Sequence, residues 1–157
     1  MKQFSIEINP EEIRNKLLNY SQQFDTCFFY DSNADVNAPT KMSYRSYDIL
    51  VALGINQKLN FENQNTFETL EAFQKSAKSW LFGYLSYDVK NEIEDLFSQN
   101  KDELNLPKVN FIEPQIVISI KGNLMQVSIL DESNDPQKIT SEINNADSNI
   151  DIDFAKS

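Results

Sequence analysis

The sequence contains no histidine, and Cys27 is its only cysteine. Histidine is the commonest general base and metal ligand, so its absence excludes Ser-His-Asp and Cys-His catalytic arrangements and argues against a zinc site. A lone cysteine cannot form an internal disulfide, which suits a reducing cytosol. The neighbouring residues are apolar, and we therefore expect Cys27 to be buried as a small hydrophobic side chain.

Positive charge is also scarce. The chain has 14 Lys and Arg against 24 Asp and Glu, which gives a formal net charge of −10. An acidic surface repels nucleic acid and anionic membranes, so neither is expected as a partner. No apolar run reaches the length of a membrane span, and the N-terminal residues turn acidic too early for a signal peptide. We therefore expect a cytoplasmic protein.

Aromatic residues are plentiful, with 11 Phe and 6 Tyr, and 157 residues are enough for one domain to bury a core unaided. Short apolar strands mixed with amphipathic helices predict an α+β domain, built mainly on antiparallel sheet with several helices. We assign this domain to residues 1–145. The polar, acidic tail 146–157 is interpreted as a linker.

Local start and stop signals predict the individual elements. Helices are expected after the caps Asn9, Thr66 and Asp135, and over residues 89–97, with the second helix continuing to Trp80. The clearest prediction is a hairpin through Gly122 and Asn123, because a two-residue turn with glycine supports positive φ. Strands are expected at residues 4–8, 26–30, 47–53, 58–61 (pairing back on 47–53), 81–86, 112–120 and 124–130.

Gly83 interrupts the aromatic and aliphatic run at residues 80–86. A glycine inside a strand indicates that another part of the chain passes closely. Trp80 and Tyr84 in the same run are expected to be core residues, because the acidic chain argues against a base-stacking platform.

Three acids follow this run. Glu92, Glu94 and Asp95 would point in different directions at helical spacing, so we expect a solvated face rather than a metal site.

Residues 83–88 (GYLSYD), called here the signature segment, resemble the G-Y-(L/W)-(S/G)-Y-(D/E) signature in the N-terminal domain of the chorismate-using enzymes. That family includes component I of anthranilate synthase and component I of aminodeoxychorismate (para-aminobenzoate) synthase. Three further segments are similar to the family, in the family's order, so that the resemblance covers roughly residues 26–130. The first, second and third similar segments are residues 28–32 (FFYDS), 47–52 (YDILVA) and 106–117 (LPKVNFIEPQIV).

The second similar segment is closer to the R-(F/Y)-D-(I/L) strand of aminodeoxychorismate synthases than to the R-Y-S-F strand of anthranilate synthases. Ser46 stands where the family has arginine, and Arg45 lies one position earlier. The resemblance implies the fold of the N-terminal, non-catalytic domain of aminodeoxychorismate synthase component I. We accordingly read residues 1–145 as a scaffold or regulatory domain.

The whole enzyme would convert chorismate and glutamine-derived ammonia into 4-amino-4-deoxychorismate for folate biosynthesis. The resemblance implies a glutamine amidotransferase subunit as partner. It also implies that Mg²⁺ binds in a C-terminal chorismate-binding domain, which these 157 residues do not contain. No catalytic, cofactor or metal residue is assigned to this chain, and we expect it to be inactive alone because no concentrated cations or acid cage would hold a dicarboxylate.

By resemblance, Asp31, Ser32, Arg45 and Tyr47 would form a tryptophan-binding or regulatory pocket. A carboxylate can accept from an ammonium group, and a hydroxyl can hold small polar groups. The alternative for Asp31 and Ser32 is an ordinary turn that ends a strand. Three other functions stay open: the regulatory, tryptophan-binding domain of anthranilate synthase component I, a stand-alone interaction domain of the same descent, and an unrelated α+β binding protein.

Overall fold

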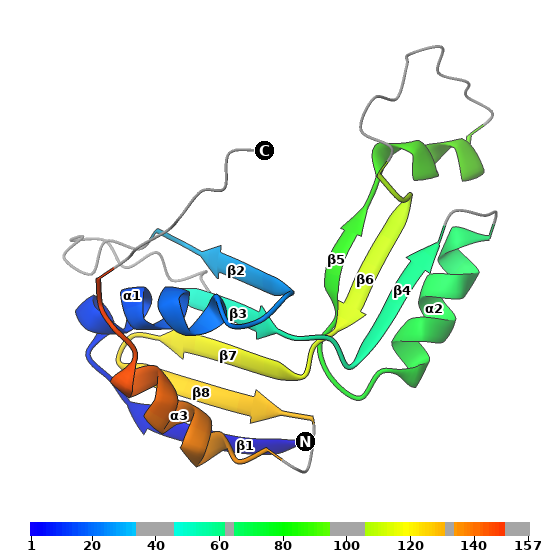
Figure 1. Cartoon of the computed structure of the whole chain (residues 1–157). Coiled ribbons are helices and arrows are strands. Elements are labelled where there is room, and N and C mark those ends of the chain that lie inside the picture. Colours follow the sequence, from blue (N-terminus) through cyan, green and yellow to red (C-terminus); the bar gives the residue numbers. More distant parts are fainter. Residues whose placement is uncertain (34–45, 62–64, 95–105, 131–133, 150–157) are drawn as a thin grey trace. The chain divides into compact units, whose positions relative to one another are not determined.

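The computed structural model divides into two compact units (Figure 1). Unit 1 comprises residues 1–54 and 115–157, and unit 2 comprises residues 55–114. Both units combine helices with antiparallel strands, which confirms the predicted α+β class. No helix in the described part of the chain is long and apolar enough to cross a membrane. The structure describes residues 1–33, 46–61, 65–94, 106–130 and 134–149.

Unit 1 is a five-stranded antiparallel sheet against which two helices pack (Figure 1). The strand order is β1-β8-β7-β3-β2, so β1 and β2 are the edge strands. Its elements are β1 (Lys2–Glu7), α1 (Pro10–Ser21), β2 (Cys27–Asp31), β3 (Ile49–Leu53), β7 (Ile116–Lys121), β8 (Leu124–Ile129) and α3 (Pro136–Asn145).

The two helices of unit 1 begin in the same way. The side chain of Asn9 accepts from the amide of Glu11 at 3.2 Å, and the side chain of Asp135 accepts from the amide of Gln137 at 3.0 Å. A proline follows each cap, and its fixed φ suits the first helical turn. Both helix starts were predicted from these caps, and both are confirmed.

The core of unit 1 lies between the helices and one face of the sheet. Alternate residues of a strand point to the same face, and Met125, Val127 and Ile129 of β8 are fully buried on that face. Leu17 of α1 and Ile143 of α3 are also completely buried. The buried cluster consists of Ile13, Leu17, Tyr20, Ile49, Val51, Leu53, Ile116, Ile118, Ile120, Met125, Val127, Ile129, Ile139 and Ile143.

Unit 2 is a smaller sheet of three strands in the order β4-β6-β5. Strand β6 pairs antiparallel with both neighbours, so β4 and β5 run parallel to each other, and α2 lies in the connection between them. Its elements are β4 (Gln57–Phe61), α2 (Thr66–Ser76), β5 (Phe82–Leu85), the 3-10 helix η1 (Tyr87–Glu92) and β6 (Val109–Glu113).

The predicted hairpin is confirmed at its turn and wrong in its first strand. Lys121 pairs with Leu124 around Gly122, whose φ of 59° is the value the turn needs. Residues 112–120 are not one strand, however, because Pro114 separates β6 of unit 2 from β7 of unit 1. Proline has no amide hydrogen to donate to a sheet, which is why it marks the break.

Residues 58–61 do not pair back on residues 47–53, contrary to the prediction. They belong to β4, which pairs with β6. The chain leaves β3 through Gly54, which adopts a left-handed φ of 67°, and enters unit 2 before β4 begins.

The structure corrects three details of α2 and the residues after it. Thr66 is the first helical residue rather than the cap, which is Asn65, and the helix ends at Ser76. Trp80 is not a core residue, because its side chain is 41% exposed while its ring stacks on Phe82.

The helix predicted at residues 89–97 is instead η1. Val89 is buried as expected, but Ile93 follows the end of η1 and is 70% exposed. Asp95, Leu96 and Phe97 lie outside the described residues.

Cys27 is exposed rather than buried. It begins β2, which is an edge strand with a neighbour on one side only. The apolar sequence around it correctly indicated a strand but did not reveal that the strand lies at an edge.

The first residues of the predicted linker are held on α1. Asn19 Nδ2 donates to the carbonyls of Asp147 and Asn149 at 2.6 and 2.7 Å, and Asn15 Nδ2 donates to the carbonyl of Ser148 at 3.0 Å. Residues 146–149 therefore lie against unit 1, whereas residues 150–157 lie outside the described part of the chain.

Candidate functional site at the end of strand β2

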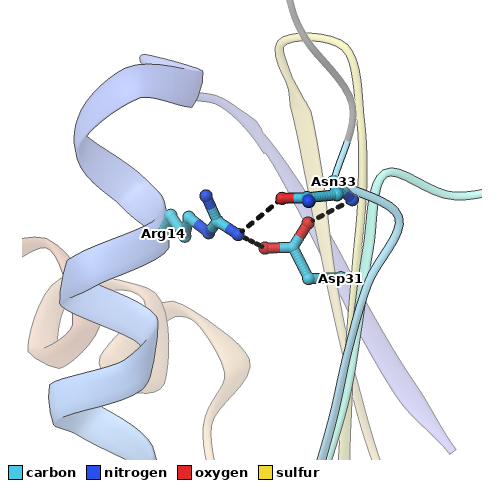
Figure 2. Close-up of polar contacts among 3 residues, drawn as sticks. All are labelled: Arg14, Asp31 and Asn33. Atoms are coloured by element: carbon cyan, nitrogen blue, oxygen red, sulfur yellow. Dashed lines mark hydrogen bonds and ion pairs between the residues drawn. The ribbon is translucent and has the colours of Figure 1, made fainter.

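Strand β2 ends in a small polar cluster formed by Arg14, Asp31 and Asn33 (Figure 2). Arg14, from α1, places Nη2 2.5 Å from Asp31 Oδ2, and the same nitrogen donates to Asn33 Oδ1 at 3.3 Å. The amide of Asn33 donates to Asp31 Oδ1 at 2.7 Å. Both carboxylate oxygens of Asp31 are therefore engaged by groups of the chain itself.

The cluster stabilises a turn with an unusual backbone. Asn33 has a left-handed φ of 53°, which asparagine tolerates better than most residues. A side-chain oxygen that accepts from the amide two residues later is the contact of an Asx turn. This is the turn that formed the alternative interpretation of Asp31 and Ser32, and ligand binding at Asp31 stays a prediction.

The ion pair lies at the boundary with solvent. The side chain of Arg14 is 49% exposed, and that of Asp31 is 21% exposed. Water and salt weaken such a pair, so its net contribution is at most about 1 kcal/mol. Arg14 nevertheless offers a half-exposed guanidinium that could receive a carboxylate from a ligand.

Three of the four predicted site residues gather at this end of the β2–β3 pair. The amide of Ser32 donates to the carbonyl of Asp48 at 2.9 Å, which extends the strand pairing by one residue. Tyr47 directly precedes Asp48 and is half-buried. Arg45 lies outside the described residues, so its place in the cluster is still a prediction.

Arg14 was missed as a site residue by the sequence analysis. It lies in the middle of a helix, and the local pattern does not show that the helix packs beside the end of β2. The sequence did offer one indication of a role for Arg14, because the chain contains only two arginines, Arg14 and Arg45. Arginine is the preferred partner of a partly buried carboxylate.

Asp48, also missed, connects β3 to the hairpin. Its Oδ2 accepts from the amide of Gly122 at 2.6 Å, and its own amide donates to the carbonyl of Ile120 at 2.8 Å. Asp48 therefore holds the β7–β8 turn in place next to the start of β3.

In unit 2, the signature segment forms β5 and the start of η1. Gly83 lies opposite Phe111 of β6, and a Cβ atom at Gly83 would lie only 2.0 Å from the carbonyl oxygen of Asn110. No side chain fits at that distance. The close approach predicted from this glycine is confirmed, and β6 is the segment that passes.

The four segments that carry the resemblance lie side by side in pairs. Within unit 1, the first and second similar segments are neighbours, with Tyr30 opposite Leu50. Within unit 2, the signature segment and the third similar segment are neighbours, with Gly83 opposite Phe111.

Glu94 is exposed as predicted, whereas Glu92 makes specific hydrogen bonds that a solvated face does not require. Its Oε2 accepts from the amide of Thr66 at 2.8 Å, and its Oε1 accepts from the Thr66 hydroxyl at 2.6 Å. These bonds lower the pKa of the Glu92 carboxyl, and the charge of Lys108 adds to the shift. Glu92 thus caps α2, whose cap residue Asn65 makes no side-chain bond of its own.

Glu113 is completely buried at the end of β6. Its Oε1 accepts from the amides of Lys78 and Ser79 at 2.5 and 2.9 Å, and its Oε2 accepts from Asn56 Nδ2 at 2.6 Å. The available sequence signal was an acidic residue placed directly between the apolar residues Ile112 and Pro114.

In the described part of the chain, no three acidic or cysteine side chains gather in a way that could hold a metal ion. A scan against protein-family models finds no match to the chain. A search of curated proteins finds no significant match. The family resemblance therefore rests on the four sequence segments.

Proposed function

We propose that this chain is a non-catalytic N-terminal domain of aminodeoxychorismate synthase component I. Its role would be to support a C-terminal chorismate-binding domain, which would carry the Mg²⁺ site and the chemistry. The observation that supports this most is the pairing of the four similar segments in neighbouring strands. The ammonia would come from a glutamine amidotransferase subunit.

The pairing matters because each segment is short and, taken alone, is weak evidence for the family. Gly83 is required by the contact with β6, which gives the glycine of the signature segment a physical reason. The aromatic residue of the third similar segment, Phe111, is the residue that faces it. Two motifs that meet at one contact support a common structural origin better than two motifs counted separately.

Asp48 supports the aminodeoxychorismate branch over the anthranilate branch. Aspartate is the residue that the aminodeoxychorismate type has here, and in this chain its carboxylate holds the amide of Gly122 at 2.6 Å. The serine of the anthranilate type has a shorter side chain and no charge, so it would make a weaker contact with the hairpin turn.

Tryptophan binding at the end of β2 is part of the same proposal. The ammonium group of the ligand would share Asp31 with Arg14, and the carboxylate of the ligand would meet the half-exposed guanidinium. Because Asp31 already has an internal cation, we expect tryptophan to bind more weakly than it would to an unpaired carboxylate.

Gene disruption tests the proposed function. Cells that lose the gene encoding this chain should stop growing in a defined medium without folate precursors. Added 4-aminobenzoate should restore growth, and so should a plasmid copy of the gene. Rescue by tryptophan instead would support the anthranilate alternative, and growth with no supplement would contradict both.

A second test uses the purified chain. With chorismate, ammonia and Mg²⁺, we expect no 4-amino-4-deoxychorismate above a control without protein, because the described residues provide no concentrated positive charge for a dicarboxylate. Chromatographic detection of turnover that depends on this chain would overturn the assignment of a non-catalytic role.

A further inference from the structure

The two edge strands of the unit 1 sheet, β1 and β2, differ in how well their sequences oppose pairing with another strand (Figure 1). Edge strands of soluble proteins usually carry charged side chains that prevent such pairing. Strand β1 begins with Lys2 and ends with Glu7, whereas residues 27–30 of β2 are uncharged. Cys27 is exposed and Tyr30 is 50% exposed, so β2 is the edge that is more open to contact.

The hydrogen bonds to β3 show which backbone groups of β2 point to the open edge. The amide of Ser32 donates to the carbonyl of Asp48 at 2.9 Å, and the amide of Gly54 donates to the carbonyl of Thr26 at 3.0 Å. Hydrogen-bonded residues alternate along an antiparallel pair, so the even-numbered residues of β2 bond to β3 and the odd-numbered ones point away from it. The residues that point away are Cys27, Phe29 and Asp31.

A second copy of the chain fits this edge, because the pattern of β2 is compatible with two-fold symmetry. In an antiparallel pair of two β2 strands centred on Phe29, Phe29 lies opposite its own copy, and Cys27 lies opposite Asp31 of the second copy. Every outward-pointing residue then meets another one, and each such pair exchanges two backbone hydrogen bonds. The two Asp31 side chains lie at opposite ends of the paired strands, so no like charges face each other.

The aromatic side chains of β2 favour the same register. Phe28 and Tyr30 point to one face of the strand, and their rings stack with centroids 6.4 Å apart. In the centred pair, Phe28 of each copy lies opposite Tyr30 of the other, and aromatic pairs of this kind stabilise antiparallel sheets. Phe29 points to the other face and packs against the buried cluster of its own unit, so the pairing does not require it to leave the core.

We propose that two copies of this chain associate through β2, which joins their five-stranded sheets into one continuous antiparallel sheet. Each copy contributes one short strand, so the association is weak. The net charge of −10 on each copy opposes it, and salt screens that repulsion. Association through β2 therefore strengthens as salt is added, which is the opposite of what a contact held by ion pairs would do.

Analytical ultracentrifugation of the complete chain tests this proposal, from about 10 µM to about 1 mM protein at low and high salt. We expect a monomer–dimer equilibrium whose dissociation constant falls as salt is added. Tyr30→Glu should raise that constant about tenfold, because it removes two aromatic contacts and adds charge to the interface. The control Tyr87→Glu makes the same change at an exposed tyrosine of unit 2 and should have little effect. A monomer at every concentration, or equal effects of the two substitutions, would overturn the proposal.

Residue-resolved amide hydrogen exchange provides a second test, which needs no substitution. The amides of Cys27, Phe29 and Asp31 should become more protected as the protein concentration rises, because they bond only in the dimer. The amides of Phe28 and Tyr30 already bond to β3, so their exchange should change little. Protection that rose in β1 instead, or that did not alternate along β2, would overturn the proposal even if a dimer formed.

Discussion

The two units of this protein are stabilised in different ways. Unit 1 has one continuous buried cluster, contributed by both helices and by the three central strands of its sheet. In unit 2, the buried apolar side chains among the described residues are those of Phe82, Val89, Val109, Ile112 and Pro114. Unit 2 instead relies on two carboxylates, Glu113 and Glu92, that bind amides from distant parts of the chain.

Exposed apolar side chains follow the same division. The large ones exposed in the described part of unit 1 are Met1, Tyr30 and Leu124, whereas those in unit 2 are Phe67, Trp80, Leu85, Tyr87, Ile93 and Leu106. From this comparison we infer that unit 2, with its smaller apolar core, depends on the contacts of Glu113 and Glu92 with backbone amides. Its stability should therefore respond to loss of charge more than to loss of volume.

Leu17→Ala should have the largest effect, and it should fall on unit 1. Leu17 is completely buried in the cluster, and truncating such a leucine typically costs about 3 kcal/mol because a cavity remains. Hydrogen exchange should rise in unit 1, while the fluorescence of Trp80, the only tryptophan, should report an unchanged unit 2. Replacing the half-buried neighbour, Leu18→Ala, serves as control. Equal loss of hydrogen-exchange protection in both units would contradict the conclusion that the two units are stabilised in different ways.

Glu113→Ala should destabilise unit 2 by about 2–3 kcal/mol. The substitution removes a buried acceptor that serves three donors, which are the side-chain amide of Asn56 and the backbone amides of Lys78 and Ser79. Urea unfolding followed by Trp80 fluorescence would measure the change, and Glu113→Gln, which keeps one carbonyl oxygen, should be intermediate. A variant as stable as the original would show that unit 2 does not depend on this carboxylate.

Glu92→Ala should cost about 1 kcal/mol, the usual effect of losing a helix cap. The effect should depend on pH, because the folded state lowers the pKa of Glu92. Its stabilisation is complete above the ordinary pKa of a glutamate and is lost as the pH falls through the lowered value. Urea unfolding at neutral and acidic pH would measure this loss, with the exposed Glu94→Ala as control. If Glu92→Ala were still less stable than the original protein in acid, the role of the Glu92 carboxylate as a helix cap would be contradicted.

Arg14→Ala should have the smallest effect, at most about 1 kcal/mol, and added salt should reduce it. Arg14→Lys keeps the charge but loses the flat guanidinium that contacts Asp31 and Asn33 together. Urea unfolding of both variants at low and high salt would separate the contribution of the positive charge from that of the guanidinium geometry. An effect as large as that of Leu17→Ala would mean that the cluster at β2 is as important for unit 1 as its apolar core.

Sequence patterns predicted unit 1 better than unit 2, for a physical reason. The alternation in β8, the caps Asn9 and Asp135, and the turn at Gly122 are all local signals, and the structure confirms each of them. The break at Pro114 was not recognised, because the apolar residues on its two sides look like one strand.

The site residues that were missed depend on contacts between distant positions. Arg14 meets Asp31 across 17 residues of sequence, and Thr66 meets Glu92 across 26. No local pattern encodes which acid a given amide will meet. Gly83 is the exception, because a glycine in an aromatic strand signals a close contact even when the partner is unknown.

The chain enters and leaves unit 2 through neighbouring residues. The amide of Asn56 donates to the carbonyl of Glu113 at 2.8 Å, and the amide of Gln115 donates to the carbonyl of Leu53 at 3.1 Å. A module whose two ends already meet can be replaced by one of another length, because the entropy cost of closing a loop grows only slowly with the number of residues in it. A short turn joining β3 directly to β7 would leave every strand of the five-stranded sheet in its present register.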